Sequence, residues 1–441
     1  MTATEDDAAL PQFPPGFLWG VSTSAHQIEG AVAERAPSVW DVFGAEPGRI
    51  RDGSTAEVAC DHVARYREDV ALVRDLGVDA YRFSVSWPRV LAPGGLDFYD
   101  RLVDELCAQG VRPVPTLFHW DLPVGLDWLE RDTAHRFAEY AATVAARLGD
   151  RVSKWITLNE PAEHTLLGHA LGEHAPGRKL LFDALPVAHH QLLAHGLAAR
   201  ALRAAGVRDL GIANSHGPTW PASDDPADTA AADLYDVILN RLFSDPLILG
   251  RYPDGFGELM PGGDVAGDLK VISEDTLDWY GINYYQPTKV GAPGTADVEF
   301  SGLTLPAELP FSVGRIDGYP TTDFDWPVVP EAFTELLTGF RERYGDRLPP
   351  LVVTENGCAY EGIDDPERIA FLQGHLRALH RALEAGVDVR GYFVWSLMDN
   401  FEWAEGYTKR FGLVHVDYAT QRRTPKASYG WLCDALRAQR P

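Results

Sequence analysis

The chain has 441 residues, of which 45% are hydrophobic and 23% are charged, a composition typical of a globular protein with a large core. It contains 39 Lys and Arg against 64 Asp and Glu, and the resulting formal net charge of −25 repels phosphate backbones and anionic lipid headgroups. Nucleic acid is therefore not an expected partner, and no run of about 18 uncharged apolar residues predicts a membrane span.

The first residues of the chain differ from the rest. Residues 1–12 are acidic and lack apolar periodicity, so they are predicted to form a flexible tail, and they show no signal-peptide pattern. The four cysteines, at positions 60, 107, 358 and 433, are too far apart for a CxxC pair or a zinc site. We expect them to be buried, reduced thiols, which favours a cytoplasmic location.

Along the rest of the chain, short apolar runs alternate with longer amphipathic stretches. Eight runs are predicted to be buried strands: 17–22, 78–85, 111–118, 153–158, 209–214, 277–285, 348–354 and 389–397. Helical periodicity lies between them, for example in 56–77 and in 366–386, where Gly386 suits a helix end.

Eight such units predict an α/β fold in which residues 13–441 form one catalytic domain, a single (β/α)8 TIM barrel. An open Rossmann-type sheet is disfavoured, because the chain has no glycine-rich phosphate loop. The stretch 287–330 is rich in Gly, Pro, Thr and Asp, and we expect it to be a long connection on the barrel rim.

Polar and aromatic residues follow nearly every predicted strand, and a barrel gathers such residues at one mouth. In chain order they are Gln27, Glu29, Arg82, His119, Trp120, Asp121, Asn159, Glu160, Asn283, Tyr285, Glu355, Asn356, Trp395, Asp399, Asn400, Glu402 and Trp403.

Two carboxylates stand out in this set, Glu160 in TLNEP and Glu355 in TENG, because their strands face each other across the barrel. Glycoside hydrolysis needs such a pair: one carboxyl protonates the departing oxygen, and the other attacks the anomeric carbon or activates water. Alone, each Glu is more often a solvated loop acid, and His119 or Trp395 more often a structural residue. The prediction therefore rests on the combination. Metal ligation is disfavoured because neither HExxH nor a paired-His spacing occurs, and no cofactor is expected.

Several motifs carry a family resemblance. The stretches FLWGVSTSAHQIEGA, PSVWDVF, EDVALVRDLGVDAYRFSVSWPRV, PVPTLFHWDLP, WITLNEP, GINYY, VVTENG and YFVWSLMDNFEWAEGYTKRFGLVHVDY resemble, in this order, the signatures of family 1 glycoside hydrolases, which are retaining, β-glucosidase-like enzymes. The resemblance spans residues 13–431. It implies a (β/α)8 barrel and an exo-acting β-glycosidase, most similar to a β-glucosidase, that cleaves small β-glycosides by double displacement.

The resemblance also implies roles for single residues. Glu160 corresponds to the acid/base and Glu355 to the nucleophile. Arg82 and Tyr285 correspond to residues that hold the nucleophile, and Asn159 to one that contacts the sugar 2-hydroxyl. The implied substrate-binding set is Gln27, His119, Trp120, Asn283, Trp395, Glu402, Trp403 and Phe411.

Within that family, Glu402 disfavours 6-phosphosugars, because a carboxylate repels phosphate, and Glu160 in place of a Gln favours O-glycosides over thioglucosides. The chain departs from many relatives at Ala162, where they carry a Trp in the leaving-group site, so we expect a wider or more polar subsite there. Short loops at 90–100 and 122–132 leave substrate length and self-association open, so a homo-oligomer of undetermined size stays an expectation. Two alternatives remain at this point: a transglycosylating enzyme of the same fold, and a catalytically silent sugar-binding barrel.

Overall fold

The computed structural model describes residues 10–261, 264–296, 298–300 and 303–440. Eight parallel strands close into a barrel in the order β1-β13-β12-β7-β5-β4-β3-β2. Their bounds are β1 Leu18–Ser22, β2 Ala80–Ser84, β3 Arg112–Phe118, β4 Trp155–Asn159, β5 Leu210–Ser215, β7 Tyr280–Tyr284, β12 Leu351–Asn356 and β13 Val389–Trp395. Each of the eight predicted runs overlaps one of these strands, with β4, β5 and β12 extending one or two residues further, which confirms the TIM barrel.

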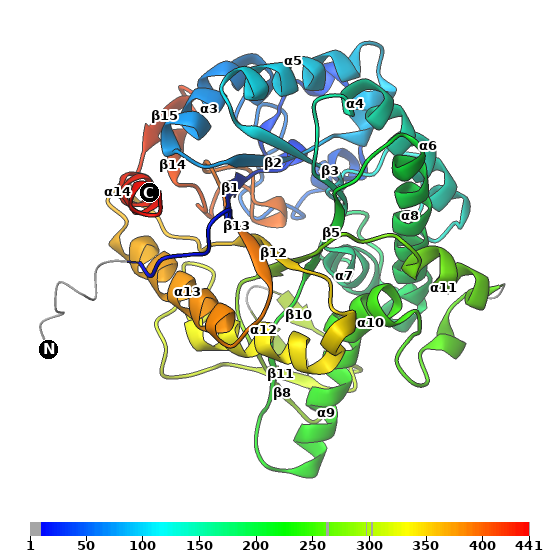
Figure 1. Cartoon of the computed structure of the whole chain (residues 1–441). Helices are drawn as coiled ribbons and strands as arrows, with labels where there is room; N and C mark the ends of the chain where they lie inside the picture. Colours follow the sequence, from blue (N-terminus) through cyan, green and yellow to red (C-terminus); the bar gives the residue numbers. More distant parts are fainter. Residues whose placement is uncertain (1–9, 262–263, 297, 301–302, 441) are drawn as a thin grey trace, which may run out of the picture.

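Helices surround the barrel (Figure 1). The α-helices are α1 Ala25–Ile28, α2 Val39–Gly44, α3 His62–Leu76, α4 Trp87–Leu91, α5 Gly95–Ala108, α6 Asp132–Leu148, α7 Pro161–Glu163, α8 Leu185–Ala204, α9 Pro226–Asp236, α10 Leu242–Leu249, α11 Val265–Ser273, α12 Pro330–Tyr344, α13 Pro366–Glu384 and α14 Ala427–Ala438. In the part of the chain that the structure describes, none of them has the length and hydropathy that a membrane crossing requires.

Of the two predicted helices, one has the expected end and the other begins later than expected. The stretch 366–386 is α13, followed by Gly386 at φ 85° as expected of a helix end. The stretch 56–77 becomes helical only at His62, because Ala59 and Asp61 take left-handed backbone angles, with φ of 48° and 50°, that interrupt a helix.

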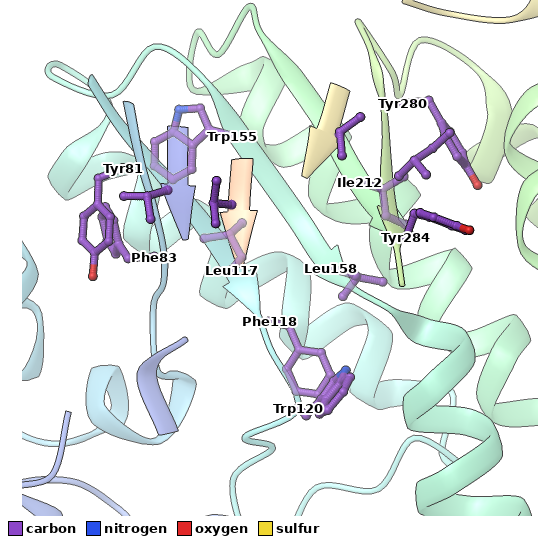
Figure 2. Packing of buried hydrophobic residues seen from close by; sticks show 14 of the residues in the cluster. Tyr81, Phe83, Leu117, Phe118, Trp120, Trp155, Leu158, Ile212, Tyr280 and Tyr284 are labelled. Atoms are coloured by element: carbon purple, nitrogen blue, oxygen red, sulfur yellow. The ribbon is translucent and has the colours of Figure 1, made fainter. Parts of the chain in front are cut away.

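The core has two layers. Inside the barrel, one side chain from each strand, or from the residue just before it, forms a plug: Leu18, Ala80, Val114, Ile156, Ala213, Trp279, Val352 and Phe393. Gly20 leaves room for this plug, since a Cβ there would lie 2.2 Å from the ring of Phe393. The larger layer lies between the strands and the helices, and Figure 2 shows part of it, with Tyr81, Trp155 and Tyr280 among its members.

Smaller sheets decorate the rim. Strand β8 (Thr288–Gly291) pairs with β6 (Thr219–Pro221) and β11 (Ser312–Gly314), β9 (Val298–Phe300) pairs with β10 (Leu303–Leu305), and β14 (Val414–Asp417) pairs with β15 (Arg422–Pro425). Four of these strands, β8 to β11, lie within residues 287–330, which were predicted to be a long connection without regular structure. Strands of three or four residues are too short to leave a periodic pattern.

The ends of the described chain meet. Residues 1–9 of the predicted tail lie outside the described residues, but the Gln12 side chain already donates to the carbonyl of Ala438 at 3.0 Å. The backbone N–H of Phe13 donates to the Gln439 side chain at 2.9 Å. The first described residues therefore pack beside α14 (Figure 1).

The cysteines are all free. Three are buried as expected, but Cys107 is exposed, because it lies on the outward face near the end of α5.

Candidate active site

The carboxyl ends of the barrel strands surround a cavity of about 550 Å³, a volume within the range of small-molecule sites. It gathers nine of the residues predicted from sequence: His119, Trp120, Glu160, Tyr285, Glu355, Trp395, Glu402, Trp403 and Phe411. Four others lie directly behind these, buried and hydrogen-bonded to them or to their neighbours: Gln27, Arg82, Asn159 and Asn283. Glu29, Asp121 and Asn356 are not part of the lining. Glu29, for example, accepts a hydrogen bond from Arg89 at 2.7 Å and has a structural role.

Both central carboxyls follow an irregularity in strand register. In β4 the pairing with β5 shifts between Ile156 and Asn159, and in β12 the pairing with β7 shifts between Val353 and Glu355. Such a shift breaks the alternation of side chains and turns the next residue toward the mouth. Glu160 itself has φ 44°, and its N–H donates to the carbonyl of Ala213 at 2.7 Å.

The carboxylate of Glu355 has a partner on each oxygen. Arg82 Nη1 donates to Oε1 at 2.5 Å, and the hydroxyl of Tyr285 donates to Oε2 at 2.7 Å. Burial raises the pKa of Glu355, while the charge of Arg82 and the hydrogen bond from Tyr285 hold it down. These partners stabilise the ionised form.

Glu160 has a different environment. Its Oε1 accepts a hydrogen bond from Asn283 Nδ2 at 2.8 Å, but no cation forms an ion pair with it among the described residues. Burial, followed by the negative charges of Glu355 and Glu163, raises the pKa of Glu160 well above its usual range. The structure therefore favours a proton on Glu160 and a charge on Glu355, and this separation divides acid and base roles between two like groups.

Asn159 joins the two sides of the site. Its Oδ1 accepts from Arg82 at 2.6 Å and from Asn283 at 3.0 Å, so its Nδ2 is left to donate to His119 Nε2 at 3.0 Å. Burial and the charge of Arg82 lower the pKa of His119 well below its usual value, so the ring is neutral and carries its proton on Nδ1. That atom is buried without a partner and is free to donate to a ligand.

The segment after β13 supplies the opposite wall. Gln27 Nε2 donates to Glu402 Oε2 at 3.1 Å and to Asn400 Oδ1 at 3.0 Å. Burial and the charge of Glu355 raise the pKa of Glu402 to about 8, so at neutral pH it can both donate and accept. Trp395 stacks with His119 at 5.7 Å between ring centroids, and Trp403 is packed against Trp120 at 4.6 Å.

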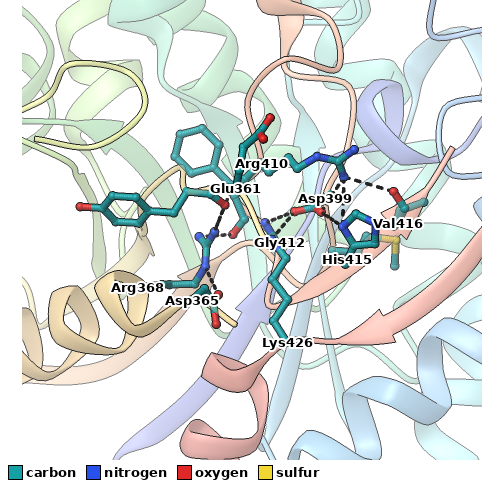
Figure 3. A network of polar contacts seen from close by, with 12 residues as sticks. Glu361, Asp365, Arg368, Asp399, Arg410, Gly412, His415, Val416 and Lys426 are labelled. Carbon is teal, nitrogen blue, oxygen red and sulfur yellow. Dashed lines mark hydrogen bonds and ion pairs between the residues drawn. The ribbon is translucent and has the colours of Figure 1, made fainter. Parts of the chain in front are cut away.

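Asp399 anchors this segment (Figure 3). It is fully buried and accepts from the N–H of Gly412 at 3.0 Å, from Arg410 at 2.9 Å and from Lys426 at 2.8 Å. Hydrogen bonding to His415 and the charge of Lys426 outweigh burial and lower the pKa of Asp399 to about 2. The carboxylate therefore ties both ends of the segment that carries Glu402 to the barrel.

Some lining residues were not predicted. Phe324 and Trp326, stacked at 4.5 Å, come from the supposedly plain rim connection. Ala162 is fully buried and is not itself part of the lining, so the expectation of a wider or more polar subsite there stays a prediction. The next residue, Glu163, lines the cavity instead and makes it more polar.

A metal-binding site is absent from the described residues. Within the described ranges, no group of three or more His, Cys, Asp or Glu side chains is arranged to hold a metal ion.

Comparisons with known proteins agree with this geometry. Residues 10–440 match the profile described as "Glycosyl hydrolase family 1". The chain is 44% identical to "Thermostable beta-glucosidase B" of Thermobispora bispora, a match that covers 99% of this chain and 93% of that protein. It is 42% identical to a "Beta-glucosidase" of an Agrobacterium species, over 97% of this chain and 96% of that one.

Solved structures give the same result. The crystal structure of a psychrophilic β-glucosidase from Micrococcus antarcticus superposes with a TM-score of 0.91 at 43% identity and covers 98% of both chains. A family 1 β-glucosidase from Thermotoga maritima superposes with a TM-score of 0.90 at 38% identity, covering 98% of this chain and 99% of that one. The likeness extends over nearly the whole length of each protein.

Proposed function

This chain belongs to glycosyl hydrolase family 1 and is a retaining β-glycosidase, and we propose that it is an exo-acting β-glucosidase with Glu355 as nucleophile and Glu160 as acid/base. The observation that carries the assignment of roles is the difference between the two carboxyls. Glu355 has Arg82 and Tyr285 on its oxygens, whereas Glu160 is buried beside two other acids.

In the first step, the carboxylic acid of Glu160 gives its proton to the glycosidic oxygen while a carboxylate oxygen of Glu355 attacks the anomeric carbon. The bond between the anomeric carbon and the leaving oxygen breaks, the alcohol departs, and a glycosyl ester of Glu355 forms. Both carboxyls lie close to Asn283, which bonds Glu160 at 2.8 Å and also lowers the pKa of Glu355. This proximity supports direct attack by Glu355, because a retaining pair leaves no space for an intervening water.

In the second step, the carboxylate of Glu160 takes a proton from water, and the resulting hydroxide oxygen attacks the anomeric carbon from the side that the alcohol left. The ester bond breaks, Glu355 regains its charge, and Glu160 is again protonated. Asn159 is suited to hold the sugar 2-hydroxyl through both steps, since Arg82, Asn283 and His119 fix its amide.

The remaining wall suits one terminal sugar. Gln27, His119 and Glu402 offer hydrogen-bonding groups, and Trp395 offers a flat face on which a sugar ring stacks. A wall of this kind around one ring supports cleavage from the non-reducing end. The proposed substrates are small β-glycosides, with glucose favoured because the relatives named above are β-glucosidases.

The test compares Glu355→Ala and Glu160→Ala with the wild type on 4-nitrophenyl and 2,4-dinitrophenyl β- and α-glucosides. The wild type should cleave only the β-glucosides, and Glu355→Ala should lose at least about 10³-fold in kcat/KM. Added azide should then give α-glucosyl azide with Glu355→Ala, because azide enters from the vacated face. With Glu160→Ala it should give the β-azide.

Glu139→Ala serves as the control, since it removes an exposed acid outside the cavity and should keep wild-type rates. Identical azide products from the two active-site variants would refute the assigned roles. A wild type silent on every glycoside would refute the enzyme and restore the sugar-binding alternative. Product analysis with added alcohol measures transglycosylation, which nothing in the site favours over hydrolysis.

We further propose a cytoplasmic location, supported by the four free cysteines, and no nucleic-acid partner, supported by the net charge of −25. Cell fractionation and a filter-binding assay test these two points. Self-association stays a prediction for sedimentation analysis.

A further inference from the structure

Part of the cavity lining comes from residues that follow Glu160 in the chain and from α9 and α10, and it differs in character from the part that holds Trp395 and Glu402. Two π-helical segments, His164–Leu171 and Val237–Arg241, form part of its wall. Apart from Thr165, the side chains that they and α10 contribute to the lining are apolar, among them Leu166, Leu167, Ile238, Leu239 and Leu242, and we call this part the outer chamber. The π-helix is rare and often found at functional sites.

The outer chamber lies where a leaving group must go. Glu160 protonates the oxygen of the departing alcohol in the proposed mechanism, so the rest of that alcohol extends past Glu160. The chain continues from Glu160 through α7 directly into the first π-helical segment. An apolar body such as an aromatic ring fits the leucine and isoleucine side chains there.

One carboxylate interrupts this apolar surface. Glu163 lies at the end of α7, three residues after Glu160, and it lines the cavity. Burial raises the pKa of Glu163, and a hydrogen bond from Ser215 opposes that rise. Burial, and after it the charge of Glu163, raise the pKa of Tyr235, which also lines the cavity, to about 12.

The cavity lining holds a second acceptor. Gln286 lines the cavity, and its Oε1 atom is buried without a hydrogen-bond partner. A buried acceptor in this state is costly unless a ligand donates to it. Glu163 and Gln286 together therefore favour a ligand that donates hydrogen bonds.

The charge around the cavity favours a cationic donor. Six glutamates line it among the described residues: Glu160, Glu163, Glu173, Glu355, Glu402 and Glu405. Burial raises the pKa of Glu160 and of Glu402 so far that both are largely protonated at neutral pH, so the negative charge comes from the other four. The two arginines in the lining are each paired with a glutamate, Arg49 with Glu46 at 2.8 Å and Arg51 with Glu405 at 3.0 Å. The histidines do not offset this, because burial lowers the pKa of His174 and of His216 to about 4.

We propose that Glu163 is a specificity-determining residue that selects leaving groups made of an apolar body and a cationic hydrogen-bond donor, such as an ammonium group, and that disfavours anionic leaving groups. A cation beside Glu163 replaces the water that burial has removed, whereas an anion meets repulsion and loses its own hydration. The inference rests on the proposed function, because it places the leaving group in the outer chamber.

The experiment uses three β-glucosides of matched shape: those of 4-(aminomethyl)phenol, 4-(hydroxymethyl)phenol and 4-carboxyphenol. Glucose release gives kcat/KM for the wild type, Glu163→Gln, Glu163→Asp and the control Glu139→Gln, which removes one exposed charge outside the cavity. Each rate is divided by the same enzyme's rate on the neutral substrate. Within one enzyme, this ratio removes any general change in the reactivity of Glu160. Comparing the ratio between enzymes then removes the intrinsic differences in reactivity among the three phenols.

Glu163→Gln should lower the cationic-to-neutral ratio about tenfold and raise the anionic-to-neutral ratio. Glu163→Asp, which keeps the charge, should retain most of the wild-type ratio, and Glu139→Gln should retain all of it. In the wild type, benzylammonium should inhibit at a concentration at least about tenfold lower than benzoate, a result that needs no variant.

The outcomes separate the two proposals. A wild type inactive on all three glucosides overturns the proposed function itself. A wild type that is active, with ratios unchanged in Glu163→Gln and equal inhibition by benzylammonium and benzoate, overturns only the role of Glu163.

Discussion

Arg82 and Tyr285 each hold one oxygen of Glu355, and this distinguishes Glu355 from Glu160 more than burial does, since both carboxyls are nearly inaccessible. A buried carboxyl without a cation keeps its proton, and one beside a guanidinium gives it up. The assignment of nucleophile and acid thus depends on single hydrogen bonds that can be removed one at a time.

Removing the hydroxyl in Tyr285→Phe should lower kcat/KM at pH 6 by about 10- to 100-fold, because a hydrogen bond to a charged group is lost. The hydroxyl favours the ionised nucleophile, so its loss raises the pKa of Glu355 and moves the acid limb of the pH profile to higher pH. Arg82 and Asn283, which also lower the pKa of Glu355, stay in place. So do Glu160 and Glu402, whose own pKa values the charge of Glu355 raises.

The measurement is kcat/KM for 4-nitrophenyl β-glucoside from pH 4 to pH 9. Trp326→Phe, which alters an aromatic packed against Tyr285 without touching Glu355, is the control. An acid limb that stays at its wild-type position in Tyr285→Phe would contradict the role given to the hydroxyl.

At the scale of elements, the segment between β13 and β14 depends on one buried charge. Asp399 is its anchor, and the side chain of Lys426, the residue after β15, is also fully buried. Because Glu402 and Trp403 lie in the middle of this segment, its anchoring is a condition for the sugar-binding wall.

Asp399→Asn should lower the free energy of unfolding by about 3–5 kcal/mol, since it leaves Lys426 and Arg410 without their buried counter-charge. The native pKa of Asp399 is lowered to about 2, so its contribution is present above the pKa of about 3.9 in the unfolded chain and is lost as pH falls toward 2. The difference in free energy of unfolding between the wild type and the variant should therefore have its full size at pH 6 and decrease between pH 4 and pH 2.

Urea unfolding at several pH values measures this gap. Asp434→Asn, which removes an exposed partner of Arg437, is the matched control and should cost about 0.5 kcal/mol or less. A gap for Asp399→Asn that is constant from pH 6 to pH 2 would show that the carboxylate charge is not what stabilises the segment.

The loop after β12 lies close against β13. A Cβ on Gly357 would lie 1.8 Å from the carbonyl oxygen of Trp395, so Gly357→Ala must push the ends of the two strands apart. Because Glu355 lies two residues before it, we expect kcat/KM to fall by more than about 100-fold together with a lower melting temperature.

The control for this change is Gly339→Ala in α12, where a Cβ meets nothing within 4 Å. It should raise the free energy of unfolding by up to about 1 kcal/mol and leave activity unchanged. Steady-state kinetics and thermal melts of both variants provide the test, and full activity in Gly357→Ala would disprove the close-packing argument.

How far the sequence could predict these elements follows from their length and burial. The eight barrel strands are buried along most of their length and leave short, largely apolar runs, so all were predicted. The register shifts before Asn159 and Glu355 leave no such trace, because they depend on pairing with β5 and β7. The sequence also could not predict that Glu163, and not Ala162, lines the cavity. The rotation of a short helix decides which of two adjacent residues faces a cavity.

At the scale of the whole molecule, the 64 acidic side chains outnumber the 39 basic ones and repel one another across the surface. Most ion pairs that could offset this are exposed, such as that of Arg136 with Asp132, and such pairs contribute little. The balance favours net repulsion in the folded state.

Raising NaCl from about 0.02 M to 0.5 M should therefore increase the melting temperature by about 2 °C or more, because the Debye length falls well below the spacing of surface charges. Thermal melts in NaCl and in KCl separate this screening from binding of a specific ion. A melting temperature that decreases steadily with salt would mean that the ion pairs outweigh the repulsion.

The closure of the barrel has a consequence for biosynthesis. Strand β1 pairs with β2 on one side and with β13 on the other, and β13 is translated roughly 370 residues after β1. At a ribosome speed of 5–20 residues per second, the second edge of β1 stays open for roughly 20 to 70 s. The nascent chain is an incomplete sheet during that time, and the unpaired edge of β1 is open to pairing with other chains until the last strand emerges from the exit tunnel.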